Sequence, residues 1–169
     1  AQVVDLNATS HLPKGVMLNL DFQQIKEGLI PNKTLYPLYV PLGDLGTENF
    51  NNRTLLAFQK GQGLDVPHSS LLDPNSDTWI VIVRFFALSN GIILSQGNHD
   101  KGYVLYLKDG NLHAAIRSGH TTVTLKGTAK SGTSDCLDHF VTAELTITES
   151  SARLSLTRHR VALAPLSGT

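Results

Sequence analysis

The chain has 169 residues, 41% of them hydrophobic, which is enough for one domain with a buried core, and no apolar run reaches the length of a membrane span. Its 14 basic and 14 acidic side chains give a formal net charge of +0, which argues against nucleic acid as a partner because phosphate binding relies on a basic surface. The single cysteine, Cys136, excludes an internal disulfide and a multi-cysteine metal site, and its two neighbouring carboxylates favour an inert thiol over a nucleophile paired with His139.

The N-terminal part of the chain predicts extended segments separated by turns. Residues 1–14 are polar and weakly patterned, which indicates a flexible leader. The alternation in residues 15–22 (GVMLNLDF) predicts a strand with one apolar face. Residues 43–52 are expected to form a loop. Shorter extended segments are predicted at residues 34–42, 54–58 and 61–67, the first of them an edge strand or a loop because two prolines interrupt it.

Residues 77–87 (DTWIVIVRFFA) give the strongest strand prediction in the chain. They are β-branched and aromatic throughout, which is typical of a buried central strand. Trp79 lies inside this run and is expected to belong to the core, where a fully buried large apolar side chain contributes ~1.5–3 kcal/mol.

Residues 91–117 predict three antiparallel strands in a row. A polar loop separates the strands at residues 92–94 and 103–107. The dipeptide Asp109-Gly110 then predicts a tight turn into residues 112–117, because it supplies the positive φ that a short hairpin needs. Both alternating faces of the middle strand are apolar, so we expect it at the centre of a sheet covered on both sides.

The remaining segments complete an all-β prediction, since none of them favours a helix of any length. About ten strands with regularly spaced turns are typical of a sandwich. We therefore expect a two-sheet antiparallel β-sandwich in which one face of each sheet is buried. The later strands are predicted at residues 121–125, 139–148, 153–157 and 160–164.

Four segments resemble laminin G-like domains of the concanavalin A-like jelly-roll superfamily. Residues 16–22 resemble the opening LDF strand of that family, and residues 61–67 (GQGLDVP) resemble its GxGLxVP step. Residues 78–85 (TWIVIVRF) resemble its FTVSAWVR strand, and residues 92–107 resemble its ILSKG…GYSLYL pair. The resemblance implies a jelly-roll domain at residues 15–169 in a secreted or cell-surface protein, periplasmic or extracellular.

The chain departs from the family pattern toward its C-terminus. Residues 138–145 (DHFVTAEL) stand where the family has WHHVAVT, and residues 154–160 lack the turn glycine of its LYVDG hairpin. The sequence stops at Thr169 before the closing strands of the family become visible. Either those strands are degenerate, or the chain is a fragment, or another chain supplies them.

The polar loop within residues 91–117 is the candidate binding site. A loop on a rigid sheet commonly carries recognition residues, and Asn, Asp and Lys side chains suit sugar hydroxyls, a carboxylate or a sulfate. The alternative is a solvated hairpin loop. Two tyrosines beside the prolines are candidates for stacking on a sugar face or for partial burial. The predicted ligand-binding residues are Asn98, His99, Asp100, Lys101, Tyr36 and Tyr39.

A calcium site is predicted at Asp73, Asn75 and Asp77. These side chains place oxygens at alternate positions and supply part of the six to eight ligands that calcium takes. The resemblance adds that laminin G-like domains often hold calcium on the sandwich rim. The alternative is an Asx-turn that leads into the following strand.

These observations predict a non-catalytic carbohydrate-binding or adhesive module whose partner is a glycan or another protein domain. A glycan-cleaving enzyme of the jelly-roll glucanase type is the first alternative. Against it, the closely spaced acids of those enzymes are missing, and Glu144 and Glu149 are five residues apart, which places them on opposite faces of a regular strand. The second alternative is a structural domain that assembles through an open sheet edge.

Overall fold

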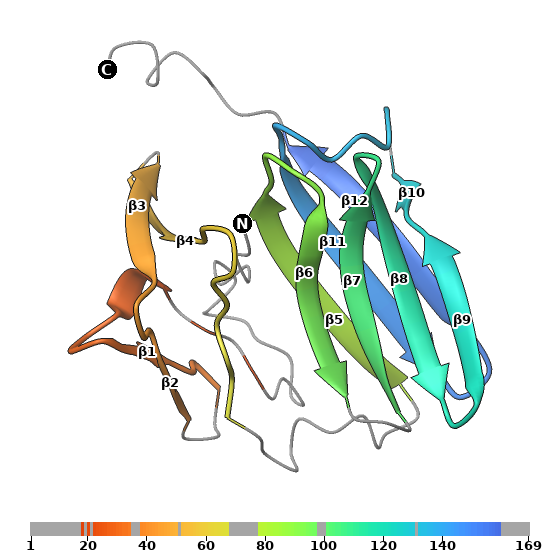
Figure 1. Cartoon of the computed structure of the whole chain (residues 1–169), viewed down its shortest axis with the longest axis horizontal. Coiled ribbons are helices and arrows are strands. Elements are labelled where there is room, and N and C mark those ends of the chain that lie inside the picture. Colours follow the sequence, from red (N-terminus) through yellow and green to blue (C-terminus); the bar gives the residue numbers. More distant parts are fainter. Residues whose placement is uncertain are drawn as a thin grey trace. The chain divides into compact units, whose positions relative to one another are not determined.

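The computed structural model describes residues 18, 20, 22–34, 38–50, 52–67, 78–97, 101–130 and 132–159. These residues lie mostly in antiparallel β-strands, so the predicted all-β sandwich class is confirmed (Figure 1). The chain divides into two compact units. The N-terminal unit is Val3–Asn75, and the C-terminal unit is Ser76–Thr169 together with Ala1–Gln2.

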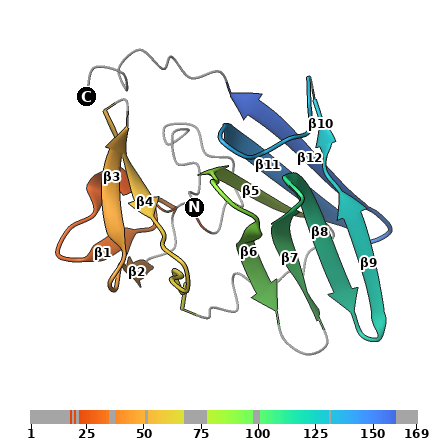
Figure 2. The ribbon, with the colours of Figure 1, turned by 45° about the horizontal axis from the view of Figure 1, so that its top comes forward.

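The C-terminal unit contains two four-stranded sheets that face each other (Figures 1 and 2). We call them the meander sheet, with strand order β6-β7-β8-β9, and the β5 sheet, with strand order β10-β12-β11-β5. The strands of the meander sheet are β6 (Gly91–Gly97), β7 (Lys101–Lys108), β8 (Asn111–Ser118) and β9 (Thr121–Lys126). The strands of the β5 sheet are β5 (Thr78–Phe86), β10 (Thr128–Ala129), β11 (Phe140–Thr148) and β12 (Ala152–His159).

The predicted three-strand meander is confirmed and continues into a fourth strand. All of its neighbours pair antiparallel, and β7 pairs with β8 from Lys101 opposite Ser118 to Lys108 opposite Asn111. The turn between these two strands has positive φ at Asp109 (52°) and Gly110 (75°), as the Asp-Gly dipeptide predicts. The hairpin sequence therefore sets the register between β7 and β8.

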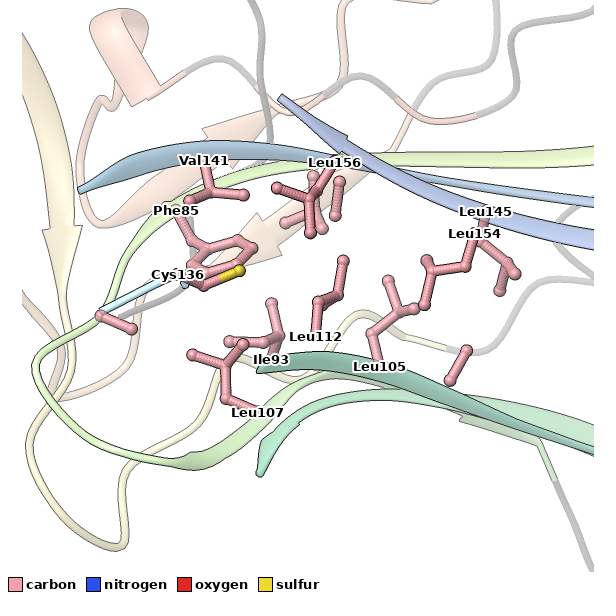
Figure 3. Packing of buried hydrophobic residues seen from close by; sticks show 14 of the residues in the cluster. Phe85, Ile93, Leu105, Leu107, Leu112, Cys136, Val141, Leu145, Leu154 and Leu156 are labelled. Atoms are coloured by element: carbon pink, nitrogen blue, oxygen red, sulfur yellow. The ribbon is translucent and has the colours of Figure 1, made fainter. Parts of the chain in front are cut away.

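A single apolar core fills the space between the two sheets of the C-terminal unit. Alternate residues of each strand point inward, so the side chains of the two sheets meet in Figure 3. Fully buried examples are Phe85 on β5, Leu105 on β7 and Leu145 on β11. Trp79 packs against this core, as predicted. The core fixes which residues of each strand face outward.

The N-terminal unit has a smaller core of its own. Its largest fully buried side chains are Leu20, Ile30, Val40 and Leu56. Two hairpins supply most of its regular structure. They are β1 (Leu29–Pro31) with β2 (Tyr39–Pro41), and β3 (Gly46–Phe50) with β4 (Arg53–Ala57), and the 3-10 turn η2 (Phe22–Gln24) precedes them.

Three strand predictions need correction. The strand predicted at residues 77–87 is confirmed over residues 78–86, but β5 is not buried throughout, because Ile80 and Ile82 are 55% and 47% exposed. Among the described strands, β5 also has a partner on one side only, β11. Strand β3 occupies part of the predicted loop at residues 43–52. The extended segment predicted at residues 61–67 forms no strand in the structure.

The predicted first strand lies mainly outside the described residues. Of its members, Leu20 forms an isolated bridge with Asn32, and Phe22 begins η2. In the part of the chain that the structure describes, no helix has the length and apolar character that crossing a membrane requires.

Candidate functional site

Most of the predicted site residues lie outside the described part of the chain. Lys101 is exposed at the first position of β7, and Tyr39 is 61% exposed at the first position of β2 in the N-terminal unit. Their predicted roles in ligand binding stay predictions. The predicted site residues that the structure does not describe are Tyr36, Asp73, Asn75, Asp77, Asn98, His99 and Asp100.

A depression of about 380 Å³ lies on the outer face of the meander sheet. The depression is shallow and open to solvent. Seven of its nine lining residues occupy two adjacent cross-strand rows. The first row is Gly97, Gly102, Arg117 and Thr122, and the second is Ser95, Val104 and Ala115.

Strand geometry explains why these residues share one face. Tyr103, Leu105 and Leu107 of β7 point into the core, so Gly102 and Val104 must point outward. The neighbouring strands follow in register, with Gly97 opposite Gly102 and Ala115 opposite Val104. The outer face therefore has an unusually low floor, built from glycine, alanine and serine.

Two glycines allow β6 and β7 to approach closely at one end of the depression. A Cβ atom on Gly102 would lie 2.6 Å from the Gln96 carbonyl oxygen and 2.8 Å from the Gly97 Cα. A Cβ atom on Gly97 would lie 2.5 Å from both the Gly102 Cα and the Lys101 carbonyl oxygen. Any other residue at either position would displace a strand, so this end of the site depends on both glycines.

An aromatic pair occupies the next cross-strand row of the same face. The ring of Tyr106 on β7 stacks on the imidazole of His113 on β8, with centroids 5.4 Å apart and planes 15° from parallel. Nδ1 of His113 lies 3.1 Å from the Asn111 carbonyl oxygen, which fixes the ring orientation. Ile92 continues this row on β6 and is 68% exposed. The depression thus adjoins a strip in which Ile92 is exposed and the aromatic pair is partly buried.

At the glycine end of the depression, the core side of the meander sheet contains the buried hydroxyl group of Tyr103. Tyr103 donates a hydrogen bond of 3.2 Å from its hydroxyl to Oε1 of Gln96, and both residues also line the depression. Burial raises the pKa of Tyr103 to about 12, and the neighbouring Trp79 indole opposes this effect. Nε1 of Trp79 is buried without a well-formed hydrogen bond to any described residue. The Tyr103 hydroxyl therefore stays protonated at neutral pH.

Cys136 is not arranged as a nucleophile. Its side chain is fully buried in the core (Figure 3), and its thiol donates to the Ser134 carbonyl oxygen at 3.4 Å. Burial raises the pKa of Cys136 to about 11, and the charge of Asp135 adds to this effect. His139 contacts Arg158 through its ring nitrogen instead of pairing with the thiol. The burial agrees with an inert thiol, which stays a prediction.

The carboxylate of Glu144 lies on the outward face of β11, on the other sheet from the depression. Its ion-pair partner is Lys130, with 3.9 Å between Nζ and Oε2. Within the described ranges, no three His, Cys, Asp or Glu side chains come close enough to hold a metal ion. The predicted calcium ligands fall outside those ranges, so their role stays a prediction.

Comparison of the chain with models of known protein families, with curated proteins and with solved structures found no match. The candidate site therefore stands on the geometry of the meander sheet. The sequence prediction named the loop after β6 but missed Ser95, Ala115, Arg117 and Thr122, which period-2 alternation places on outward faces. Their common position becomes visible only when the register across four strands is known.

Proposed function

We propose that this chain is a non-catalytic carbohydrate-binding module, of the laminin G-like jelly-roll type that its sequence resembles, in a secreted or cell-surface protein. The observation that carries the proposal is the depression on the meander sheet next to the stacked Tyr106–His113 pair. Small residues form its floor, and polar side chains form its rim.

The chemistry of this face suits a sugar ring. Ser95 and Thr122 present hydroxyl groups that both donate and accept hydrogen bonds, as sugar hydroxyls require. An exposed aromatic ring can stack on the C–H groups of the apolar side of a pyranose, while its edge remains in contact with water. His113 stacks on Tyr106, whose partly buried ring is the candidate stacking surface of this site.

The predicted loop residues belong to the same proposal. Residues 98–100 connect Gly97 to Lys101 along the chain, and the strand residues next to this connection, Gly97 and Gly102, line the depression. Asn98, His99 and Asp100 are therefore candidates for further contacts with a ligand held there. Calcium at Asp73, Asn75 and Asp77 stays a separate prediction.

Filling the depression tests the proposal directly. Ala115→Trp places a large side chain on the floor, and Ser155→Trp is the matched control, because Ser155 is a small outward-facing residue at the centre of β12. We expect a glycan array to give selective hits with the natural chain and with Ser155→Trp, and none with Ala115→Trp. Equal binding by both variants, with folded circular dichroism spectra, would place recognition elsewhere.

A role in assembly is the second candidate function. Ile80 and Ile82 are exposed on the outward face of β5, whose only partner among the described strands is β11. Antiparallel pairing of β5 with β5 of a second copy would continue the sheet through the backbone groups of this edge and would bring the outward isoleucines of the two copies side by side. Light scattering should then give a dimer that the double variant Ile80→Lys, Ile82→Lys converts to a monomer.

A further inference from the structure

We infer that the depression on the meander sheet selects sugars that carry a carboxylate, and that Arg117 binds this group. The inference rests on the proposed glycan-binding function and names the ligand class for the same site. Arg117 is the one charged side chain among the nine residues that line the depression.

The guanidinium of Arg117 is held in place while most of its donors stay available. Its Nε donates a hydrogen bond of 3.2 Å to the Gly119 carbonyl oxygen in the β8–β9 turn. None of the described residues bonds its two terminal nitrogens, and the side chain is exposed. The planar guanidinium fork matches a carboxylate with two parallel hydrogen bonds, and these charge-assisted bonds are about twice as strong as neutral ones.

Charges on this face favour an anion. The outward positions of β6 to β9 carry three cations, Lys108, Arg117 and Lys126, and among the described residues no carboxylate. The chain as a whole has 14 basic and 14 acidic side chains, so the residues other than these three cations carry three more acidic than basic side chains. Glu144, for example, lies on the β5 sheet beside Lys130.

The distribution of the three cations favours one carboxylate over a densely sulfated polymer. Only Arg117 lines the depression, whereas Lys126 lies in the Tyr106–His113 row and Lys108 lies one row beyond. A highly charged polymer is typically bound by several adjacent cations, and its affinity falls steeply with salt. The two distant lysines would increase the association rate of an anionic sugar, but they would contribute little to its affinity.

The test compares acidic oligosaccharides with their own neutral forms. The probes are oligomers containing galacturonate, glucuronate or sialate, the same oligomers after reduction of the carboxyl to a primary alcohol, and dextran sulfate. The natural chain, Arg117→Gln, Arg117→Lys and the control Arg153→Gln are titrated with each probe by calorimetry. Arg153 is an exposed, outward-facing arginine on β12. It belongs to the β5 sheet, whereas the depression lies on the meander sheet.

We expect at least one acidic oligomer to bind about tenfold or more tightly than its reduced form. Arg117→Gln should remove this preference, Arg117→Lys should recover part of it, and Arg153→Gln should leave it unchanged. Equal binding of the acidic and reduced forms would overturn the carboxylate inference while leaving glycan binding intact. Equal, salt-sensitive binding of dextran sulfate would overturn it in favour of general polyanion binding. Failure of every probe would overturn the inference together with the proposed function.

Discussion

The imidazole of His113 lies flat against the ring of Tyr106, 5.4 Å from centroid to centroid, on the exposed face of two paired strands. In the proposed function, a sugar contacts the part of the Tyr106 ring that stays accessible to solvent. This pair gives the meander sheet a fixed platform beside a depression. Substitutions at this pair therefore test the proposed function directly.

Replacing Tyr106 by alanine should weaken glycan binding about tenfold or more, because the stacking face is lost. Tyr106→Phe should keep most of the affinity, since it keeps the ring. Isothermal titration with an oligosaccharide that binds the natural chain measures both. Tyr39→Ala is the control, because Tyr39 is a tyrosine that the sequence predicted for ligand binding and is exposed in the N-terminal unit. A loss with Tyr39→Ala and none with Tyr106→Ala would move the site to that unit.

Gly102→Ala should lower the free energy of unfolding by ~1–3 kcal/mol, the usual cost of forcing an extra methyl group into a packed position. The new Cβ atom would lie 2.6 Å from the Gln96 carbonyl oxygen, so β6 and β7 must separate. Gly46→Ala in β3 is the matched control, because no atom lies within 4 Å of its Cβ position. Urea unfolding measures both variants. Equal stability of the two would show that the strands do not approach as closely as described.

Phe85→Ala should destabilise the C-terminal unit by ~3–5 kcal/mol, because it leaves a cavity in a fully buried position. Ile80→Ala, on the same strand but 55% exposed, should change stability by about 0.5 kcal/mol or less, as is usual for surface positions. Denaturant unfolding followed by tryptophan fluorescence reports on this strand through Trp79. If Ile80→Ala cost as much as Phe85→Ala, another surface would have to cover β5 in solution.

Alkaline pH should destabilise the natural chain through Cys136. Burial raises the pKa of this thiol from 9.0 to about 11, so between these values the unfolded chain loses the proton and the folded chain keeps it. The stabilising contribution is fully present below pH 9 and is lost as the pH rises toward 11.

The variant Cys136→Ala isolates this effect from other titrating groups. At pH 8 it should be less stable than the natural chain, because the side chain that it removes is buried. The difference in free energy of unfolding should shrink between pH 9 and pH 10.5, since only the natural chain has this thiol. A difference that stays constant over the range would mean that the Cys136 pKa is unshifted.

The sequence predicted the meander well because its signals are local. The Asp109-Gly110 turn and the alternation of β7 need only a few neighbouring residues. Strand β3 was missed because its residues (GTENF) are nearly all exposed and show no apolar face. Its pairing with β4 stabilises an extended segment whose own composition is typical of a loop.

The burial of β5 was overestimated for a physical reason. A continuous apolar run is typical of a strand covered on both faces, yet Ile80 and Ile82 point away from the core and remain about half exposed. Likewise, β7 was expected to be covered on both sides, whereas Val104 and Tyr106 are only partly buried. Hydrophobic pattern alone does not tell a covered face from a partly exposed one.

The register shift in β6 determines which of its side chains line the depression, and this matters when related chains are compared. The pairing with β7 shifts by one residue between Ile92 and Leu94, and beyond that shift Ser95 stands opposite Val104. If the same residues paired without this shift, Leu94 would stand opposite Val104 on the outer face and Ser95 would turn toward the core. A related chain in which β6 paired without the shift would therefore replace a hydroxyl-bearing floor with a leucine. Homologues should therefore be grouped by the pairing register of β6 with β7 before their ligands are compared.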